Sequence, residues 1–95
     1  MRITDIIWKD RYVEKLATKH GVTVGEAEDV LLSRPVVRKV AKGRVQGEHV
    51  YSAMGQTGSG RYLIVFFIGK PHGMALPISA RNMDASERRY HGRHK

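Results

Sequence analysis

The feature that most constrains the fold is the run Tyr62–Ile68, seven consecutive residues rich in β-branched and aromatic side chains. Seven residues are too few for a membrane helix, which needs about 20. A strand that is apolar on both faces belongs in the centre of a sheet, where other elements cover both sides. The rest of this 95-residue chain must therefore supply neighbouring strands and covering helices, which predicts a single domain over residues 1–95.

Two helices are predicted upstream of this strand. Residues 10–20 place their apolar side chains on one helical face, and Gly21 suits the left-handed position that follows a helix. Thr23 and Glu26 have the spacing of a capping box at the start of the second helix, which Pro35 ends. We expect the two helices to form an antiparallel hairpin on one side of the sheet.

The remaining segments predict strands and a last short helix. A short first strand is expected within residues 1–8, and alternation or β-branching marks further strands over residues 36–41, 49–55, 62–68 and 74–81. Pro77 indicates an edge position or a bulge. A capping signature at Asp84 and Glu87 begins a helix that should end near His91, with residues 92–95 as a frayed tail. The predicted class is α+β, with three to four antiparallel strands after the helical hairpin.

The positive charge is concentrated in the second part of the chain. Residues 36–95 hold eleven basic and three acidic residues, whereas residues 1–35 hold six of each, so the net charge of +8 lies entirely after residue 35. Such an excess attracts polyanions. It favours nucleic acid as a partner, although charge alone does not separate nucleic acid from an acidic protein.

Several classes of protein lack support in the sequence. The chain has no cysteine, so it forms no disulfide and no thiolate metal site. It contains no phosphate-binding loop, dinucleotide fingerprint or metalloenzyme motif, and we expect neither a cofactor nor a metal. Since the N-terminus does not resemble a signal peptide and no run could span a membrane, we expect a cytoplasmic protein.

Four segments, in the same order along the chain, resemble the pattern of BrnT-type toxins. They are residues 19–27 (Lys-His-Gly and the following cap), 47–55, 60–65, and the pair 78–81 and 87–90. This resemblance implies a RelE-like fold of the RelE/ParE superfamily and metal-independent cleavage of mRNA by an endoribonuclease. It also implies neutralisation by a ribbon-helix-helix antitoxin, with which the toxin would repress its own promoter and reach operator DNA. The segment Val50–Ser52 departs from the family, which often has an arginine there.

The resemblance suggests catalytic roles for five residues. Arg61 and Arg81 border apolar strands, and we expect them to converge and stabilise the negative charge of one scissile phosphate. Glu48 and His49 could take the proton of the 2′-hydroxyl, and Tyr90 could donate a proton or stack a base. Without the resemblance, the arginines would count as ordinary solvent-facing residues, the Glu48–His49 pair as exposed polar residues and Tyr90 as a packing residue.

A second set of basic residues is predicted to bind the RNA backbone. Arg38, Lys42 and Arg44 share one parity along their strand and should project from one face. The full predicted set is Lys19, Arg38, Lys42, Arg44, Arg88 and Arg89. Some of these could instead contact the antitoxin. Two alternatives stay open, a basic module that binds nucleic acid or protein without catalysis and a gyrase poison like the ParE relatives.

Overall fold

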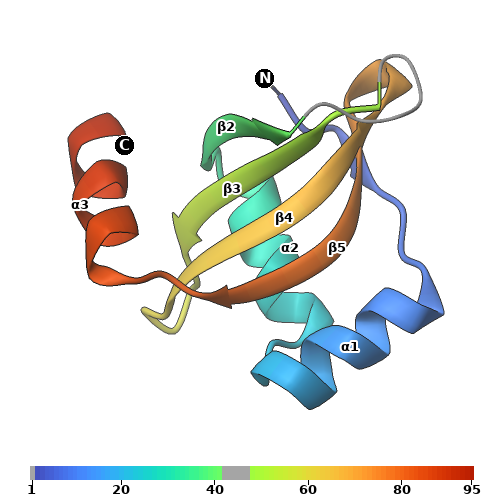
Figure 1. Cartoon of the computed structure of the whole chain (residues 1–95), viewed down its shortest axis with the longest axis horizontal. Helices are drawn as coiled ribbons and strands as arrows, with labels where there is room; N and C mark the ends of the chain where they lie inside the picture. Colours follow the sequence, from blue (N-terminus) through green and yellow to red (C-terminus); the bar gives the residue numbers. More distant parts are fainter. Residues whose placement is uncertain (1, 42–47) are drawn as a thin grey trace.

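The α+β class is confirmed by a computed structural model, which describes residues 2–41 and 48–95 (Figure 1). The elements in chain order are β1 (Asp5–Ile6), α1 (Asp10–His20), α2 (Val24–Leu32), β2 (Val36–Ala41), β3 (Val50–Gln56), β4 (Tyr62–Lys70), a 3₁₀ turn (Pro71–Gly73), β5 (Met74–Asn82) and α3 (Ala85–His94). None of the helices in this part of the chain has the length and apolar character that a membrane span requires.

The strands form one sheet in the order β1-β5-β4-β3-β2, so the apolar strand β4 lies at the centre as predicted. Strands β2 to β5 are antiparallel neighbours. The prediction did not include the parallel pairing of β1 with β5, which makes a mixed sheet of five strands. Only two residues of the expected first strand pair with β5. A strand pattern in the sequence does not show which other strand will pair with it, so the parallel pairing could not be predicted.

Pro77 lies in a bulge, one of the two positions that its missing N–H allows. The register between β4 and β5 shifts between Phe66 and Phe67, and Phe67 then pairs with Pro77. Pro77 is fully buried. Proline cannot donate a hydrogen bond to the ladder. The bulge therefore accommodates Pro77 while keeping it buried.

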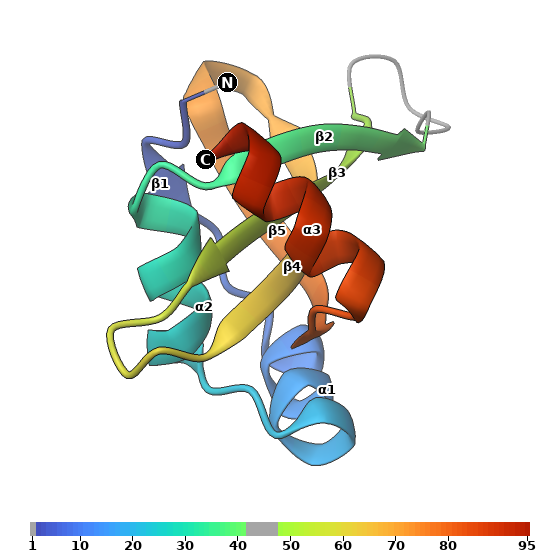
Figure 2. The same ribbon diagram turned by 90° about the vertical axis from the view of Figure 1, so that its left-hand side faces the viewer.

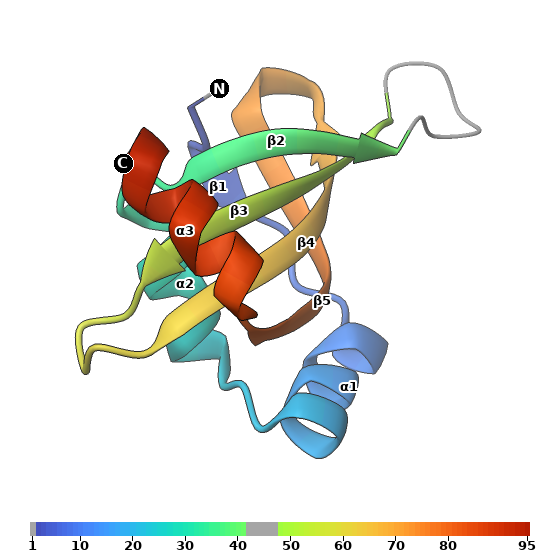
Figure 3. The ribbon, with the colours of Figure 1, turned by 60° about the vertical axis from the view of Figure 1, so that its left-hand side comes forward.

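The two faces of the sheet carry different cores, which follow from the alternation along β4. Leu63, Val65 and Phe67 are fully buried in the larger core together with residues of α1 and α2, and this side is called the α1/α2 face. Ile64 and Tyr62 belong to the smaller core, which includes Tyr90 of α3, and this side is called the α3 face. Figures 2 and 3 show α3 on one side of the sheet and α2 on the other.

The α3 face is only partly covered. In Figure 1, α3 stands at one end of the sheet, and no other described helix lies in front of the near face. Phe66, at the centre of this face, is half-buried, whereas its neighbour Phe67 on the α1/α2 face is fully buried. A half-open sheet face that carries an aromatic ring is available to a partner.

Both predicted helices exist and lie on the same side of the sheet as predicted, but they pack on different strands. α1 packs on β5, and α2 packs on β3 and β4. Gly21 ends α1 in the left-handed conformation with φ 61°. Each helix therefore buries its apolar stripe on different strands of the same sheet face.

The capping boxes predicted for α2 and α3 are both present, Thr23 with Glu26 and Asp84 with Glu87. The expected frayed tail over residues 92–95 is wrong, because α3 continues to His94. The ring of His94 stacks on that of Tyr90 with 3.9 Å between the ring centroids, and its Nδ1 lies 2.8 Å from the Tyr90 carbonyl oxygen. This local contact extends the helix through Gly92.

Candidate nucleic-acid interface

The two arginines expected to grip one phosphate lie on opposite faces of the sheet, so the predicted convergence is wrong. Arg61 precedes β4 and reaches toward the α1/α2 side, where its partners are Glu26 and the end of α1. Arg81 pairs in register with Ile64 and therefore belongs to the α3 face. The physical reason is the strand register. Arg61 precedes β4 with the parity of Leu63, whereas Arg81 lies opposite Ile64, and adjacent residues of a strand face opposite sides of the sheet.

Arg61 is held as a structural clamp between three elements. Its Nη1 donates to the Gly21 carbonyl oxygen at 2.9 Å and to Glu26 Oε2 at 3.1 Å, and its Nε donates to Asn82 Oδ1 at 2.7 Å. The pKa of Glu26 is lowered by the backbone N–H of Thr23 and, in addition, by Arg61. All these contacts tie the α1–α2 junction to the ends of β4 and β5, so they assign Arg61 to stability.

Arg81 forms a bidentate ion pair with Glu87 of α3. Nη1 donates to Oε1 at 2.7 Å and Nη2 donates to Oε2 at 2.8 Å. The Arg81 side chain is 40% exposed, whereas that of Glu87 is 14% exposed. The hydrogen bonds from Arg81, followed by the backbone N–H of Asp84 and the charge of Arg38, hold the pKa of Glu87 below its ordinary value. Glu87 is therefore an ionised carboxylate held by the guanidinium of Arg81.

Three arginines of the α3 face lie over aromatic rings. The guanidinium carbon of Arg38 lies 4.0 Å from the ring centroid of Tyr90, that of Arg88 4.1 Å from Tyr62, and that of Arg81 5.6 Å from Phe66. These distances are within the range of cation–π contacts. We call these six residues (Arg38, Arg81, Arg88, Tyr62, Phe66 and Tyr90) the arginine–aromatic surface. It brings together Arg38, Arg81, Arg88 and Tyr90 of the predicted site.

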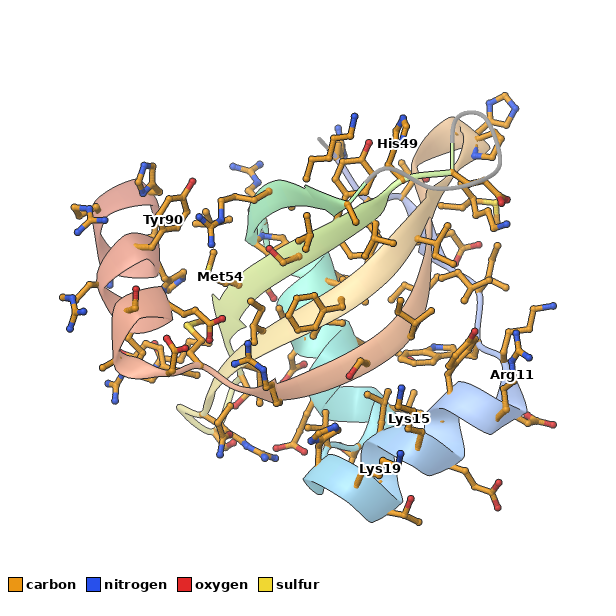
Figure 4. The ribbon with its side chains drawn as sticks, viewed as in Figure 1. Arg11, Lys15, Lys19, His49, Met54 and Tyr90 are labelled. Atoms are coloured by element: carbon orange, nitrogen blue, oxygen red, sulfur yellow. The ribbon has the colours of Figure 1, made fainter. Side chains whose placement is uncertain are left out.

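Glu48 and His49 lie elsewhere. They precede β3, whose first residue Val50 pairs with Ile68 near the end of β4, whereas Arg81 pairs with Ile64. Four residues of strand correspond to about 13 Å along the sheet. Figure 4 shows His49 and Tyr90 far apart along β3. Glu48 is paired with Lys70 in this region. The predicted proton-transfer pair is therefore separated from the arginine–aromatic surface.

The remaining predicted RNA contacts are dispersed. Lys19 is exposed on α1, where Figure 4 shows it beside Lys15 and away from Tyr90. Arg89 is exposed on α3. Lys42 and Arg44 lie outside the described residues. Of the predicted basic set, Arg38 and Arg88 are the members that the structure places on the arginine–aromatic surface.

Sequence reasoning missed Ser52, which lies on the α3 face of β3 opposite Arg38. Its side chain is 1% exposed, and its Oγ has no hydrogen-bond partner among the described residues. A buried hydroxyl without a partner costs free energy, so such groups often indicate a ligand position. It also missed Phe66 and Glu87 as members of the site. The sequence shows Glu87 six residues after Arg81, but Glu87 was assigned only to the cap of the last helix.

No cluster of three or more histidine, cysteine or acidic side chains that could hold a metal ion occurs within residues 2–41 and 48–95. The described polar groups of the arginine–aromatic surface are cationic or hydroxyl-bearing, except for Glu87. Such groups suit an anionic ligand.

Acid should destabilise the protein in two stages. Burial lowers the pKa of His91, which is 8% exposed, below its ordinary value of 6.5. The unfolded chain then binds this proton more readily, so the free energy of unfolding falls as the pH drops below 6.5. Glu26 and Glu87 have lowered pKa values, so their contribution is present above 4.5 and is lost below it. Urea unfolding between about pH 8 and pH 2 should show both stages, and His91→Gln should remove only the upper one. An unchanged upper stage in that variant would contradict this assignment.

Comparisons with known proteins add no relationship. No protein-family model matches the chain, and the search of curated proteins found no similar protein.

Proposed function

We propose that this protein is a ribonuclease toxin that binds single-stranded RNA on the arginine–aromatic surface and cleaves it without a metal. The fold would be RelE-like, and an antitoxin of the ribbon-helix-helix class would neutralise the toxin and form the repressor complex with it. The observation that carries the proposal is the set of three guanidinium groups over aromatic rings on a half-open sheet face.

This surface has both groups that single-stranded RNA requires. Unstacked bases bind on aromatic rings, and arginine binds phosphate oxygens through a planar fork of donors. Phe66 and Arg81 offer one such combination, whereas the ring of Tyr90 is already covered by the Arg38 guanidinium and the His94 ring, so this pair offers the charge of Arg38 rather than a stacking surface. The surface is also cationic, since it carries the guanidinium groups of Arg38, Arg81 and Arg88 against the carboxylate of Glu87.

For the chemistry, Arg81 would stabilise the charge of the phosphorane. A guanidinium stays charged throughout the reaction, and its two Nη groups already bind two carboxylate oxygens at 2.7 and 2.8 Å. The 2′-oxygen would attack the phosphorus and lose its proton to solvent water while the bond from phosphorus to the 5′-oxygen breaks. The hydroxyl of Tyr90, which lies beside Arg38 on the same face, would protonate the leaving 5′-oxygen and regain its proton from water. An acidic segment of the antitoxin would cover the same arginines.

RNA binding should depend on Arg38 and not on its neighbour Lys39. Both are exposed on β2, but Arg38 lies on the α3 face and Lys39 has the opposite parity. With a fluorescent single-stranded RNA, Arg38→Ala should weaken binding and reduce the slope of log K against log salt by about 0.7, the value for one lost phosphate contact. Lys39→Ala should leave both quantities near those of the wild type. Equal losses in the two variants would mean that binding follows net charge and that the surface is wrongly placed.

A second candidate is a module that binds RNA without cutting it. It is favoured by the distance of Glu48 and His49 from Arg81 and by the ion pair that engages Arg81. Incubation of the purified protein with RNA in the presence of a chelator decides between the two candidates. The nuclease should give defined fragments in proportion to protein concentration, and expression without antitoxin should arrest growth. A binding module should give salt-sensitive association and no fragments.

A further inference from the structure

The carboxylate of Glu87 has the geometry of a bound anion. Its two oxygens accept from the two Nη groups of Arg81, the same fork with which arginine binds two oxygens of a phosphate. Glu87 is also the more buried partner, with 14% of its side chain exposed against 40% for Arg81. The acidic group is thus seated on the arginine–aromatic surface while the guanidinium remains accessible.

The carboxylate lies in the field of a second arginine. The charge of Arg38 contributes to the lowered pKa of Glu87, after the hydrogen bonds from Arg81 and the N–H of Asp84. Glu87 therefore stays ionised at neutral pH. Its negative charge offsets the positive charge of Arg81, which a phosphate would otherwise bind.

Ser52 supplies an independent sign that a ligand belongs on this face. Its buried Oγ has no partner among the described residues, and it lies between Arg38 and Phe66 in the cross-strand row. Phe66 is the cross-strand neighbour of Ser52, and the guanidinium of Arg81 lies over the Phe66 ring.

We infer that Glu87 occupies an anion site formed by the Arg81 guanidinium, and that a phosphate group of the RNA displaces it on binding. This inference rests on the proposed function for the identity of the ligand. After displacement, the Glu87 carboxylate keeps the Asp84 N–H, which donates to its Oε1 at 2.9 Å. The helix cap can therefore persist while Arg81 changes partner.

The opposite role for Glu87 makes an opposite prediction. If Glu87 merely orients Arg81 for RNA, its loss should weaken binding, as loss of a positioning residue does. If Glu87 competes with phosphate, neutralising it should strengthen binding. The sign of the change therefore separates the two roles.

The chain offers a matched pair of variants. Glu87→Gln removes the charge from the ion pair and keeps the capping box, since glutamine suits this position as glutamate does. Asp84→Asn removes one charge from the same cap and keeps the N-cap hydrogen bond, but Asp84 donates nothing to and accepts nothing from the Arg81 side chain in the contacts of the described residues. Both variants should remain folded, which thermal unfolding checks.

Binding of a fluorescent single-stranded RNA at constant salt is the first measurement. Glu87→Gln should bind about fivefold more tightly than the wild type, which corresponds to the ~1 kcal/mol of an exposed ion pair. Asp84→Asn should bind less than about twofold more tightly. Weaker binding by Glu87→Gln, or equal gains in both variants, would overturn the inference.

Inorganic phosphate is the second probe, followed by the NMR signal of the Arg81 Nε–H group. In Glu87→Gln this signal should shift at a lower phosphate concentration than in the wild type or in Asp84→Asn. A phosphate shift without RNA binding by any variant would support the anion site and overturn the proposed function. RNA binding with identical phosphate titrations in all three proteins would support the function and overturn the anion site.

Discussion

The Arg81→Ala variant should lose about a hundredfold or more in RNA cleavage, because it lacks the group that stabilises the phosphorane charge. Arg81→Ala also leaves the Glu87 carboxylate, 14% exposed, without its guanidinium partner and should lose about 1–2 kcal/mol of unfolding free energy, but Glu87 keeps the Asp84 N–H and the helix cap persists. The variant should therefore retain a wild-type far-UV spectrum and a cooperative unfolding transition. Cleavage of a labelled RNA in the presence of a chelator is the measurement, with single-turnover rates to separate chemistry from binding.

Arg61→Ala is the matched control, because it removes the same side chain from the opposite face. It should lose about 2 kcal/mol of unfolding free energy, since the Glu26 carboxylate and the carbonyl oxygen of Gly21 lose a charged donor. At temperatures where it is folded, it should still cleave RNA. Cleavage that is abolished in folded Arg61→Ala and preserved in Arg81→Ala would reverse the roles given to the two arginines.

Phe67→Ala should be the most destabilising change, with a loss of about 3–5 kcal/mol in unfolding free energy. The ring is fully buried in the core beneath α1 and α2 and stacks on Tyr51 at 5.5 Å between ring centroids. Its removal leaves a cavity under the central strand, where neighbouring strands restrict collapse. Urea unfolding followed by circular dichroism gives the value.

Phe66→Ala tests the same prediction from the other face. The two residues are adjacent on β4 and chemically identical, but Phe66 is half-buried on the α3 face. Its truncation should cost markedly less stability and should weaken RNA binding, since a base loses its stacking partner. Equal losses of stability in both variants would contradict the assignment of two unequal faces.

The local elements of this fold were readable because their signals are short in range. The capping boxes at Thr23 and Asp84, the left-handed Gly21 and the central position of β4 are all as predicted. Each depends on residues within a few positions of one another or on one continuous apolar run. The end of α3 was misplaced although the contact beyond it, Tyr90 with His94, is also local, because the helix end was placed from apolar residues and residues 92–95 contain none.

The candidate site was only partly predictable. Arg38, Arg81, Arg88 and Tyr90 were named from charge and resemblance, and the structure places them on one face. Arg61 was named for the same reasons and lies on the other face. Positive charge and a border position describe Arg61 and Arg81 equally, and the parity that separates them depends on the register of β4 and β5 across a bulge.

By itself, the sequence determined the α+β class, the helix boundaries set by caps, the central strand and the excess of positive charge, since these follow from local periodicity and composition. The tertiary structure alone decided which arginines share a face, that β1 pairs in parallel with β5, and that Glu87 is seated on Arg81. Strand register and long-range pairing depend on the relative free energies of packing the whole chain, which no local pattern encodes.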